Sequence, residues 1–330
     1  MTPITSWTLA RGLCSVEGPT VGPDGWVLNV CSISRPNENW PTRGGDITAT
    51  HRDSPLQTSV VLNTSTPEIS GIPAALAFGP DHCLYATDEG RRAVLRVTPD
   101  GQAANFITHW RGQPINGPND LSFDPDGNLF FTDPWTSSPR NPIGAVYGYA
   151  WGSGELHRID AGLKFPNGII VRQGRLYVAE TFTRMVWVYD VVGPGQAISK
   201  RKFCVLPEIP DAPLLPEAMR ESVGIDRVAG PDGMAFDAAG NLYVAHFGSG
   251  GIYVYDPDGR LLDRIATPGI QPTNVCFGGL AHDQLYVSVD DLGILAVLDI
   301  GVPGDRVNFC PSTVPDHPWR AILPRRLSAR

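Results

Sequence analysis

Apolar residues alternate with polar ones in short runs along this chain, and tight-turn sequences separate the runs. One run covers residues 121–123 and the next covers residues 129–131, with Asp-Pro-Asp-Gly in the segment between them. Asp-Gly between two apolar runs favours a tight connection between antiparallel strands, so the pattern predicts a β-hairpin. Asn119 and Asp120 stand where the first strand begins, although strand packing alone would favour apolar side chains there.

The same hairpin pattern occurs six times, with Leu-Tyr-Val or a close variant in the second strand. The copies begin near residues 15, 72, 117, 165, 230 and 271. A repeat of roughly 40–50 residues made of strands and turns is typical of a β-propeller with four strands per blade. We therefore predict an all-β fold, a six-bladed β-propeller in which residues 1–330 form a single domain. Residues 5–12 are expected to close the ring, and residues 311–330 are expected to be a surface tail.

Two irregular stretches interrupt the repeat. Residues 32–53 lack periodicity and are expected to form a loop. Residues 207–230 form a long insertion, within which residues 216–222 are expected to form one short helix. Long insertions are either functional lids or loops without a function, and the sequence leaves both alternatives open.

Charge and composition limit the cellular compartment and the classes of partner that we expect for this protein. The chain has 26 Lys and Arg residues against 34 Asp and Glu residues, which gives a net charge of −8. This balance disfavours nucleic acid and anionic membranes as partners. The first residues do not resemble a secretory signal, and no apolar run approaches the about 18 residues of a membrane span, so we expect a cytoplasmic protein. The six cysteines are scattered without a C-x-x-C motif, which is typical of buried thiols.

One equivalent position of the six hairpins carries polar residues in most copies. The innermost strands of a propeller line its central channel, so the first residues of these strands converge on one mouth of the channel. Two carboxylates and two amides, with no His or Cys among them, favour Ca²⁺; Mg²⁺ and Mn²⁺ are possible, and Zn²⁺ is less natural. The predicted metal ligands are Glu17, Asn119, Asn167 and Asp232. The other two equivalent residues, Ala74 and Thr273, are not part of this set.

A simpler explanation is that Asn and Asp cap turns where strands begin. Four such residues in one register favour the metal site over this explanation. Strand alternation directs Asp120 away from the side that Asn119 faces, so Asp120 is expected to brace the strand rather than to bind the ion. His246 ends the second strand of the fifth copy. It either reaches the pocket or is a structural histidine.

Several hairpins resemble those of a family of sugar lactonases that includes gluconolactonase, regucalcin (senescence marker protein) and the luciferin-regenerating enzyme. The resemblance extends over roughly residues 15–303. The segments that carry it include Asn-Gly-Pro-Asn-Asp at 116–120, Phe-Pro-Asn-Gly at 165–168, Gly-Pro-Asp-Gly-Met-Ala at 230–235 and Pro-Thr-Asn-Val-Cys-Phe-Gly-Gly at 272–279.

The resemblance implies a six-bladed propeller with one divalent metal ion in its central channel. It implies that Glu17, Asn167 and Asp232 bind the ion and that Asn119 lies at the ion or at its substrate. Asp232 would also be the general base or nucleophile. A related calcium-dependent phosphotriesterase is similar to this set too. Some family members carry a substrate-binding arginine two residues before the residue equivalent to Asn119, where this chain has Gly117.

These observations predict a metal-dependent enzyme that hydrolyses a sugar lactone, in which the ion polarises the lactone carbonyl and Asp232 takes a proton from water. Asn119, Asp120, Trp135 and His246 are candidate substrate-binding residues, and Trp40 and Phe247 are further candidates for the pocket wall. One alternative is a propeller that binds calcium or a small molecule without turnover. The other is a phosphotriesterase-like hydrolase. The sequence leaves the oligomeric state open.

Overall fold

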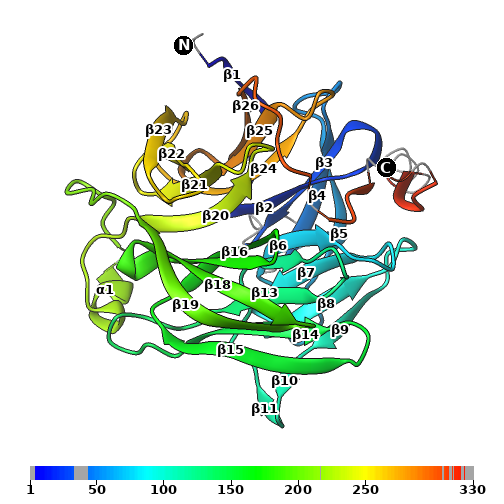
Figure 1. Ribbon diagram of the computed structural model, residues 1–330. Helices are drawn as coiled ribbons and strands as arrows, with labels where there is room; N and C mark the ends of the chain where they lie inside the picture. The colour runs from blue at the N-terminus through cyan, green and yellow to red at the C-terminus, as the bar shows by residue number, and fades with distance from the viewer. Residues whose placement is uncertain are drawn as a thin grey trace.

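Six four-stranded antiparallel sheets surround a central channel in the computed structural model (Figure 1). The structure describes residues 4–32, 44–215, 217–306, 308–311, 314, 316–320 and 323. The six-bladed propeller predicted from the repeat is therefore confirmed. Trp40, a predicted part of the pocket wall, lies outside the described residues.

Each blade runs from an inner strand to an outer strand in chain order. Blade 1 contains β2 (Val16–Val21), β3 (Trp26–Cys31), β4 (Asp46–His51) and β5 (Thr58–Asn63). Blade 2 contains β6 (Pro73–Phe78), β7 (Leu84–Asp88), β8 (Ala93–Val97) and β9 (Ala103–Ile107). Blade 3 contains β12 (Leu121–Phe123), β13 (Leu129–Asp133), β14 (Gly144–Ala150) and β15 (Glu155–Leu163). Between blades 2 and 3, β10 (His109–Trp110) and β11 (Gln113–Pro114) form a small hairpin.

The second half of the chain continues the same order. Blade 4 contains β16 (Pro166–Arg172), β17 (Arg175–Glu180), β18 (Met185–Gly193) and β19 (Gln196–Val205). Blade 5 contains β20 (Gly230–Phe236), β21 (Leu242–Phe247), β22 (Gly251–Tyr255) and β23 (Leu261–Ala266). Blade 6 contains β24 (Pro272–Gly278), β25 (Gln284–Val289), β26 (Ile294–Asp299) and, as its outer strand, β1 (Ser6–Arg11). The described part of the chain contains three 3₁₀ turns: η1 (Pro23–Gly25), η2 (Thr181–Thr183) and η3 (Asp290–Leu292).

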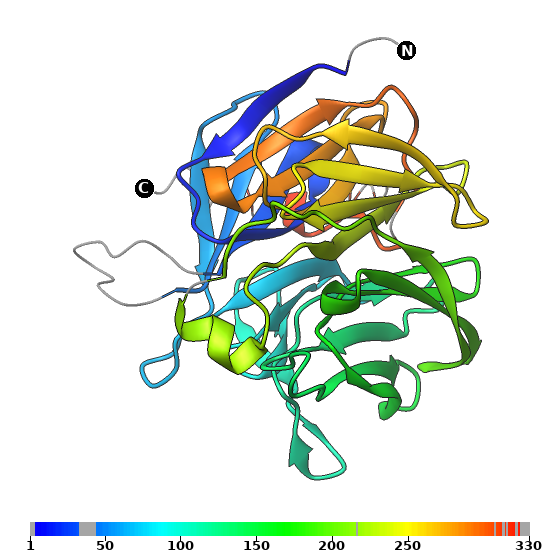
Figure 2. The same ribbon diagram turned by 90° about the vertical axis from the view of Figure 1, so that its left-hand side faces the viewer.

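The ring closes because the first strand of the chain pairs with the last. Ser6 lies opposite Leu298 and Arg11 lies opposite Ile294 in an antiparallel ladder between β1 and β26. Figure 2 shows β1, in blue, running along the orange strand β26. Blade 6 is therefore built from both ends of the described chain, as the sequence predicted, and the ring has no open edge between its first and last blades.

The turn between β12 and β13 depends on one aspartate. Asp124 Oδ1 accepts hydrogen bonds from the backbone N–H groups of Asp126, at 3.0 Å, and Asn128, at 2.8 Å. Gly127 supplies the left-handed backbone of this turn, with φ of 87°. Asp237 and Asn241 repeat the same contact in blade 5, where Asn241 N–H donates to Asp237 Oδ1 at 2.8 Å.

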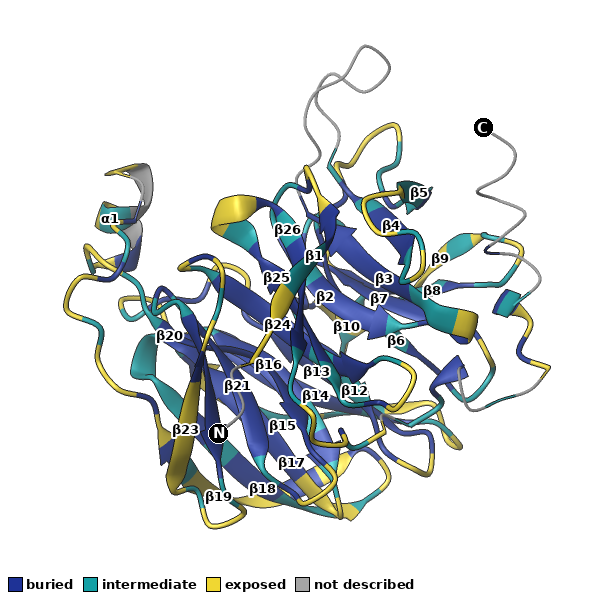
Figure 3. Cartoon of the chain, turned by 90° about the horizontal axis from the view of Figure 1, so that it is seen from above, coloured by how far each residue is buried: buried dark blue, intermediate teal, exposed yellow. Residues whose placement is uncertain are grey.

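The Leu-Tyr repeat is explained by packing between neighbouring blades. A tyrosine of the second strand in one blade meets, edge to face, a phenylalanine of the inner strand in the next blade, a favourable geometry for aromatic rings. The centroid distances are 5.2 Å for Tyr85–Phe123, 5.0 Å for Tyr177–Phe236 and 5.1 Å for Tyr243–Phe277. Figure 3 shows the inner parts of the blades buried and many of the connecting loops exposed.

The insertion before β20 contains α1 (Glu217–Val223), near the short helix predicted at 216–222. It contacts the segment that follows β13, because Arg140 Nη1 donates to Glu221 O at 2.5 Å. Within the described residues, no helix has the length and apolar character needed to cross a membrane. All six cysteines are described, and none of them forms a disulfide.

The prediction that residues 311–330 form a surface tail is wrong for part of that segment. Trp319 and Leu323 are fully buried and belong to the apolar cluster of blades 1 and 2. The Trp319 ring lies 5.8 Å from that of Phe78, and its Nε1–H donates to His82 O at 3.1 Å. These two residues therefore belong to the core, which the Pro- and Arg-rich composition of the segment did not indicate.

Candidate metal centre at one mouth of the channel

The inner strands share an irregularity at the position that the repeat singled out. A bulge re-aims the side chains beside it and strengthens the local twist of the strand. Five of the six inner strands change pairing register next to the equivalent position. The shifts fall between Glu17 and Thr20, Pro73 and Ala75, Pro166 and Ile169, Pro231 and Met234, and Pro272 and Asn274. The sequence pattern did not predict these shifts.

A glycine follows three of the four predicted ligands, and the neighbouring strand lies directly against it. A Cβ on Gly168 would lie 2.2 Å from Asp232 O, and one on Gly18 would lie 2.4 Å from Ala75 Cα. A Cβ on Gly233 would lie 2.0 Å from Asn274 Oδ1. A side chain at these positions would push the inner strands apart. The Glu-Gly, Asn-Gly and Asp-Gly pairs therefore keep this end of the channel narrow.

Hydroxyl groups join neighbouring blades at the same level at five of the six junctions between blades. A Ser or Thr side chain of one blade donates to a backbone carbonyl of the neighbouring inner strand. The contacts are Ser32–Pro73 at 2.6 Å, Thr87–Asn119 at 2.5 Å, Thr132–Asn167 at 2.7 Å, Thr181–Pro231 at 2.9 Å and Thr273–Val16 at 2.8 Å. Two of these carbonyls belong to predicted ligands, and two others belong to residues next to predicted ligands. The hydroxyls therefore hold the backbone that presents those side chains.

Glu17 and Asp232 are brought together from blades 1 and 5. Burial raises the pKa of Glu17 well above its ordinary value, and the nearby carboxylate of Asp232 raises it further. Burial also raises the pKa of Asp232, with a further contribution from Asp120. Gly18 N–H donates to Glu17 Oε2 at 3.1 Å. No basic side chain among the described residues is a cause of either shift.

The two asparagines each have their amide nitrogen bonded within the protein. Asn119 Nδ2 donates to Glu89 Oε1 at 2.9 Å. Asn167 Nδ2 donates to Thr181 Oγ1 at 3.2 Å. An amide whose nitrogen is occupied in this way presents its oxygen as an acceptor. Contacts of this kind are how groups behind a metal ligand set its orientation.

These features fit a hard divalent cation. A half-buried carboxylate on Glu17 and a buried one on Asp232, with no basic partner among the causes of their pKa shifts, are unfavourable unless protons or a cation neutralise them. Carboxylate and amide oxygens are the donors that Ca²⁺ takes in proteins. Within the described ranges, no cluster of three or more His, Cys, Asp or Glu side chains is arranged to hold a metal ion. The candidate centre therefore depends on the amide oxygens as well as on the two carboxylates.

The other predicted residues have distinct places. Asp120 is buried and accepts backbone N–H groups of Leu121, at 2.8 Å, and Ile169, at 3.1 Å, and burial raises its pKa to about 7. These are bracing contacts between blades 3 and 4. Trp135 is 39 % exposed, and its Cβ would lie 2.7 Å from a Cβ on Gly117. Phe247, at the end of β21, is only half-buried.

His246 does not reach a pocket in this structure. Its side chain is fully buried and packs edge to face on Tyr253, with ring centroids 4.9 Å apart. Neither ring nitrogen bonds to any described group. A residue with no exposed surface cannot contact a substrate, so we leave His246 out of the candidate site. The other alternative, a structural histidine whose ring nitrogens are hydrogen-bonded, is not seen either, because both nitrogens lack described partners.

Two acidic residues near the site were not predicted. Glu89 is 7 % exposed, and burial raises its pKa to about 8 although the hydrogen bond from Asn119 opposes the shift. Glu89 contributes to the raised pKa of Asp232, and Asp290 contributes to the raised pKa of both Glu17 and Asp232. Both residues directly follow the second strand of a blade whose equivalent position carries no predicted ligand. The shared position of these two acids is visible in the sequence, but it matches no known motif and was therefore not recognised as part of a site.

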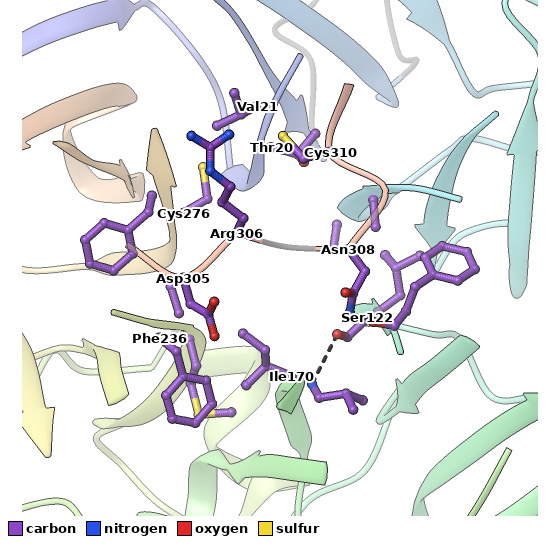
Figure 4. A pocket seen from close by; sticks show the side chains of 18 of the residues that line it. Thr20, Val21, Ser122, Ile170, Phe236, Cys276, Asp305, Arg306, Asn308 and Cys310 are labelled. Atoms are coloured by element: carbon purple, nitrogen blue, oxygen red, sulfur yellow. Dashed lines mark hydrogen bonds between the residues drawn. The ribbon is translucent and has the colours of Figure 1, made fainter. Parts of the chain in front are cut away.

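Beyond the candidate centre, the channel widens into a cavity of about 370 Å³ (Figure 4). All six inner strands line it, and Asp305, Arg306 and Asn308 of the C-terminal segment lie along its rim. Of the predicted residues, only Asp120 contributes to its wall. The cavity is therefore separate from the position where Glu17 and Asp232 meet.

Comparison with known proteins gives the family. A model described as the SMP-30/Gluconolactonase/LRE-like region matches residues 43–290. The chain belongs to this family. The resemblance drawn from the hairpins is therefore confirmed.

The relatives of this chain in the SMP-30/gluconolactonase family are named for different enzyme activities. Diisopropyl-fluorophosphatase of Loligo vulgaris is 32% identical over 230 residues, which are 64% of this chain and 68% of the relative. Gluconolactonase of Zymomonas mobilis is 32% identical over 214 residues, 61% of this chain and 56% of the relative. Pentonolactonase XacC of Haloferax volcanii is 31% identical over 172 residues. The chain spans about half the length of these two lactonases (56% and 52%).

Solved structures of the same family share the fold. A gluconolactonase from Xanthomonas campestris superposes with a TM-score of 0.70 at 23% identity, covering 92% of this chain and 91% of that one. A luciferin-regenerating enzyme superposes with a TM-score of 0.69 at 19% identity, covering 93% of this chain and 100% of that one. At these identities the likeness concerns the architecture of the propeller.

Proposed function

We propose that this chain is a metal-dependent hydrolase that opens a sugar lactone, as the gluconolactonases of its family do by name. The observation that carries the proposal is the shared place of Glu17 and Asp232, which stand at the equivalent position of the inner strands of blades 1 and 5, interact electrostatically and have no described basic side chain among the causes of their raised pKa values. The amide oxygens of Asn119 and Asn167 complete a set suited to Ca²⁺, with Mg²⁺, Mn²⁺ or Zn²⁺ as alternatives. One bound divalent ion is the proposed cofactor.

Glu17, Asn167 and Asp232 would hold the ion, and Asn119 would bind it directly or through water. A divalent ion held there would polarise the lactone carbonyl and stabilise the negative charge that develops on its oxygen. The proton transfer in this mechanism is carried out by a side chain of the protein. Asp232 takes a proton from the attacking water as general base. A carboxylate beside a cation is only a modest base, which suffices for an activated ester such as a lactone.

Trp135 is the proposed wall of the substrate site. Its exposed indole lies next to Gly117, two residues before Asn119. An indole offers a flat apolar surface against which a sugar ring can pack while its hydroxyls meet polar groups. The proposed partner is accordingly a small-molecule lactone. No described helix could span a membrane, and the net charge of −8 disfavours a nucleic acid, so neither is part of the proposal.

A phosphotriesterase-like hydrolase is the second candidate. The relative named diisopropyl-fluorophosphatase matches 230 residues of this chain at 32% identity, the same identity as the gluconolactonase. A hard cation polarises a phosphoryl oxygen as readily as a carbonyl oxygen, so the same residues suit either electrophile. A third candidate is a propeller that binds the ion without turnover.

A substrate panel separates the three candidates. Purified protein would be assayed with Ca²⁺, Mg²⁺, Mn²⁺ or Zn²⁺ on aldono-1,4- and 1,5-lactones and on one dialkyl fluorophosphate. Lactone hydrolysis above the spontaneous rate with little fluorophosphate hydrolysis supports the proposal. The reverse preference supports the phosphotriesterase, and tight metal binding without either activity supports the binding protein.

A further inference from the structure

The cavity in the channel takes no part in the proposed hydrolysis. Along each inner segment, the position equivalent to the predicted ligands comes first, and the residues that line the cavity follow it. In blade 3, Gly117 beside Trp135 precedes Asn119, whereas Ser122 follows Asn119 and lies in the cavity wall. The cavity and the proposed substrate wall are therefore on opposite sides of the candidate centre.

The cavity is open to solvent at the end remote from the candidate centre. Three of the residues that line it, Pro125, Gln173 and Arg306, are exposed. Its volume of about 370 Å³ lies within the range of roughly 300–1,000 Å³ that holds small ligands in proteins. A small molecule can therefore enter from this side without passing the candidate metal centre.

The wall of the cavity offers mainly apolar contacts. Ser122 Oγ already accepts Val171 N–H at 3.2 Å, and at the rim Asn308 Nδ2 donates to Phe123 O at 2.9 Å. A ligand rich in hydroxyl groups would therefore find few unpaired partners, and an apolar body suits the wall better. The apolar side chains drawn along the wall in Figure 4 include Val21, Ile170 and Phe236.

The two arginines that line the cavity differ in their partners. Arg172 Nε donates to Asp305 Oδ2 at 2.6 Å, and its guanidinium lies over the Phe236 ring, 5.3 Å from the centroid. Arg306 lies at the rim (Figure 4) and forms neither an ion pair nor a hydrogen bond with any described residue. The rim therefore presents one arginine that is able to bind an anion.

The acids of the cavity wall do not occupy Arg306. Asp305 is paired with Arg172. Asp120 belongs to the inner end of the cavity, beside Asn119, and accepts backbone N–H groups of blades 3 and 4. The cavity thus combines an apolar wall with a cation at its entrance, which are the two features that an anionic amphiphile requires.

We propose that the cavity is a second ligand site for a small amphiphile with an apolar body and a carboxylate head. The body packs against the inner strands, and the head pairs with Arg306 at the rim. A guanidinium binds a carboxylate through two parallel hydrogen bonds, which favours this head group over a neutral one. The site does not depend on the proposed hydrolysis, because the ligand enters and binds on the other side of the candidate centre.

The test is calorimetric titration of the Ca²⁺-loaded protein with octanoate, octan-1-ol and octylammonium, which share an apolar chain and differ in the head group. Arg306→Gln removes the charge at the rim. Ile170→Trp fills the cavity and leaves both the rim and the candidate centre unchanged. Arg260→Gln is the matched control for loss of one positive charge, because Arg260 is exposed in the turn between β22 and β23. Thermal unfolding checks that each variant folds.

The wild type should bind octanoate about fivefold more tightly than octan-1-ol, the effect of one partly exposed ion pair, and should bind octylammonium most weakly. In Arg306→Gln, the affinity for octanoate should fall to that for octan-1-ol, which should itself be unchanged. Ile170→Trp should weaken binding of both probes by about tenfold or more, because the indole occupies their place. Arg260→Gln should bind as the wild type does.

Three results would overturn the proposal. Unchanged octanoate binding in folded Ile170→Trp would mean that the carboxylate binds elsewhere, for example at the metal ion. Equal affinity of the wild type for octanoate and octan-1-ol, or equal effects of Arg306→Gln and Arg260→Gln, would remove Arg306 as the partner of the head group. Absence of binding of all three probes would remove the site. If Ile170→Trp does not fold, the comparison of Arg306→Gln with Arg260→Gln decides.

Discussion

Asp232 of blade 5 raises the pKa of Glu17 of blade 1, because both carboxylates lie at the same end of the channel, Glu17 half-buried and Asp232 buried, and no described basic side chain is a cause of either shift. Two partly desolvated carboxylates in this relationship repel each other when both are ionised. The fold tolerates the arrangement only if protons or a cation reduce the charge. Much of the behaviour expected of the protein follows from this electrostatic interaction.

The metal-free protein should become less stable as pH rises from 6.5 to 8.5. Folded Glu89 has a pKa of about 8 against an ordinary 4.5, and the pKa of Glu17 is also raised. The native state then holds more protons than the unfolded state, so the free energy of unfolding falls with rising pH until these groups have ionised. The Tm of the protein in the presence of a chelator, measured by thermal unfolding between pH 6.5 and 8.5, tests this prediction.

Added Ca²⁺ should reverse the loss. At 100 times its Kd, a ligand that binds only the native state adds about 2.7 kcal/mol, and the gain should be larger at pH 8.5 than at pH 6.5. A chelated protein whose Tm is constant over this range, or a Tm that Ca²⁺ does not shift, would contradict the account of the two carboxylates.

His246→Phe should stabilise the protein. Both imidazole nitrogens are buried without a described partner, and an unsatisfied buried polar group costs about 1–3 kcal/mol. Burial also lowers the pKa of His246 to about 4. The unfolded state therefore binds more protons between about pH 6.5 and 4, and stability falls as pH falls through this window.

Urea unfolding at pH 7 and pH 5 tests the histidine. The variant should gain about 1 kcal/mol or more at pH 7, and a larger amount at pH 5 because its phenylalanine does not titrate. His109→Phe is the control, since His109 is exposed on β10. If the His246 variant is less stable than the wild type at both pH values, the ring has a partner that the described contacts do not include.

Thr132→Val should weaken metal binding without touching a ligand side chain. The substitution removes the hydroxyl that donates to Asn167 O at 2.7 Å and accepts Asp120 N–H at 3.1 Å. Loss of a buried hydrogen bond costs about 1–2 kcal/mol of stability, and Asn167 should lose part of its fixed orientation. Calorimetric titration with Ca²⁺ should show a higher Kd.

Thr267→Val supplies the comparison, because Thr267 also donates to a backbone carbonyl at 2.7 Å, that of Gly269, in the segment between β23 and β24. It should lose similar stability and keep the Ca²⁺ affinity of the wild type. Equal effects of the two variants on Kd would remove the hydroxyl contacts between blades from the account of the site.

The variants Asp232→Asn and Asn167→Ala distinguish the role of Asp232 as a general base from its role as a metal ligand. Both remove or weaken a contact to the ion, but only the first removes a carboxylate that takes a proton. With excess Ca²⁺, Asn167→Ala should recover part of its activity, whereas Asp232→Asn should stay slower by about 10²-fold, the usual size of a general-base contribution. Metal content must be measured in each variant. Near-normal hydrolysis by a fully metallated Asp232→Asn protein would leave Asp232 a ligand only.

The repeat made the fold predictable. Six hairpins with one equivalent polar position are visible without a structure, because strand alternation and Asp-Gly turns are local properties of the sequence. The pairing of β1 with β26 followed from the need to close a ring. The burial of Trp319 could not be predicted in the same way, because one tryptophan in a Pro- and Arg-rich segment has no periodicity that reports its partner.

The candidate site was predictable to the extent that it repeats. Glu17, Asn119, Asn167 and Asp232 share one register, and each can be found by aligning the copies. Glu89 and Asp290 follow the second strands of the two blades without a predicted ligand, but the hydrogen bond between Glu89 and Asn119 exists only in the folded chain. For His246 the sequence left a place in the pocket and a structural role equally open, and its packing against Tyr253 could be seen only in the fold.

The most direct measurement is the rate of glucono-1,5-lactone hydrolysis by metal-stripped protein during titration with Ca²⁺. The account predicts a rate near the spontaneous one in the stripped protein, with activity returning in proportion to bound metal and saturating at one ion per chain. Glu17→Gln should require a higher Ca²⁺ concentration for the same return, because it lacks one of the two carboxylates. Full activity in protein shown by elemental analysis to contain no divalent metal would contradict the central claim.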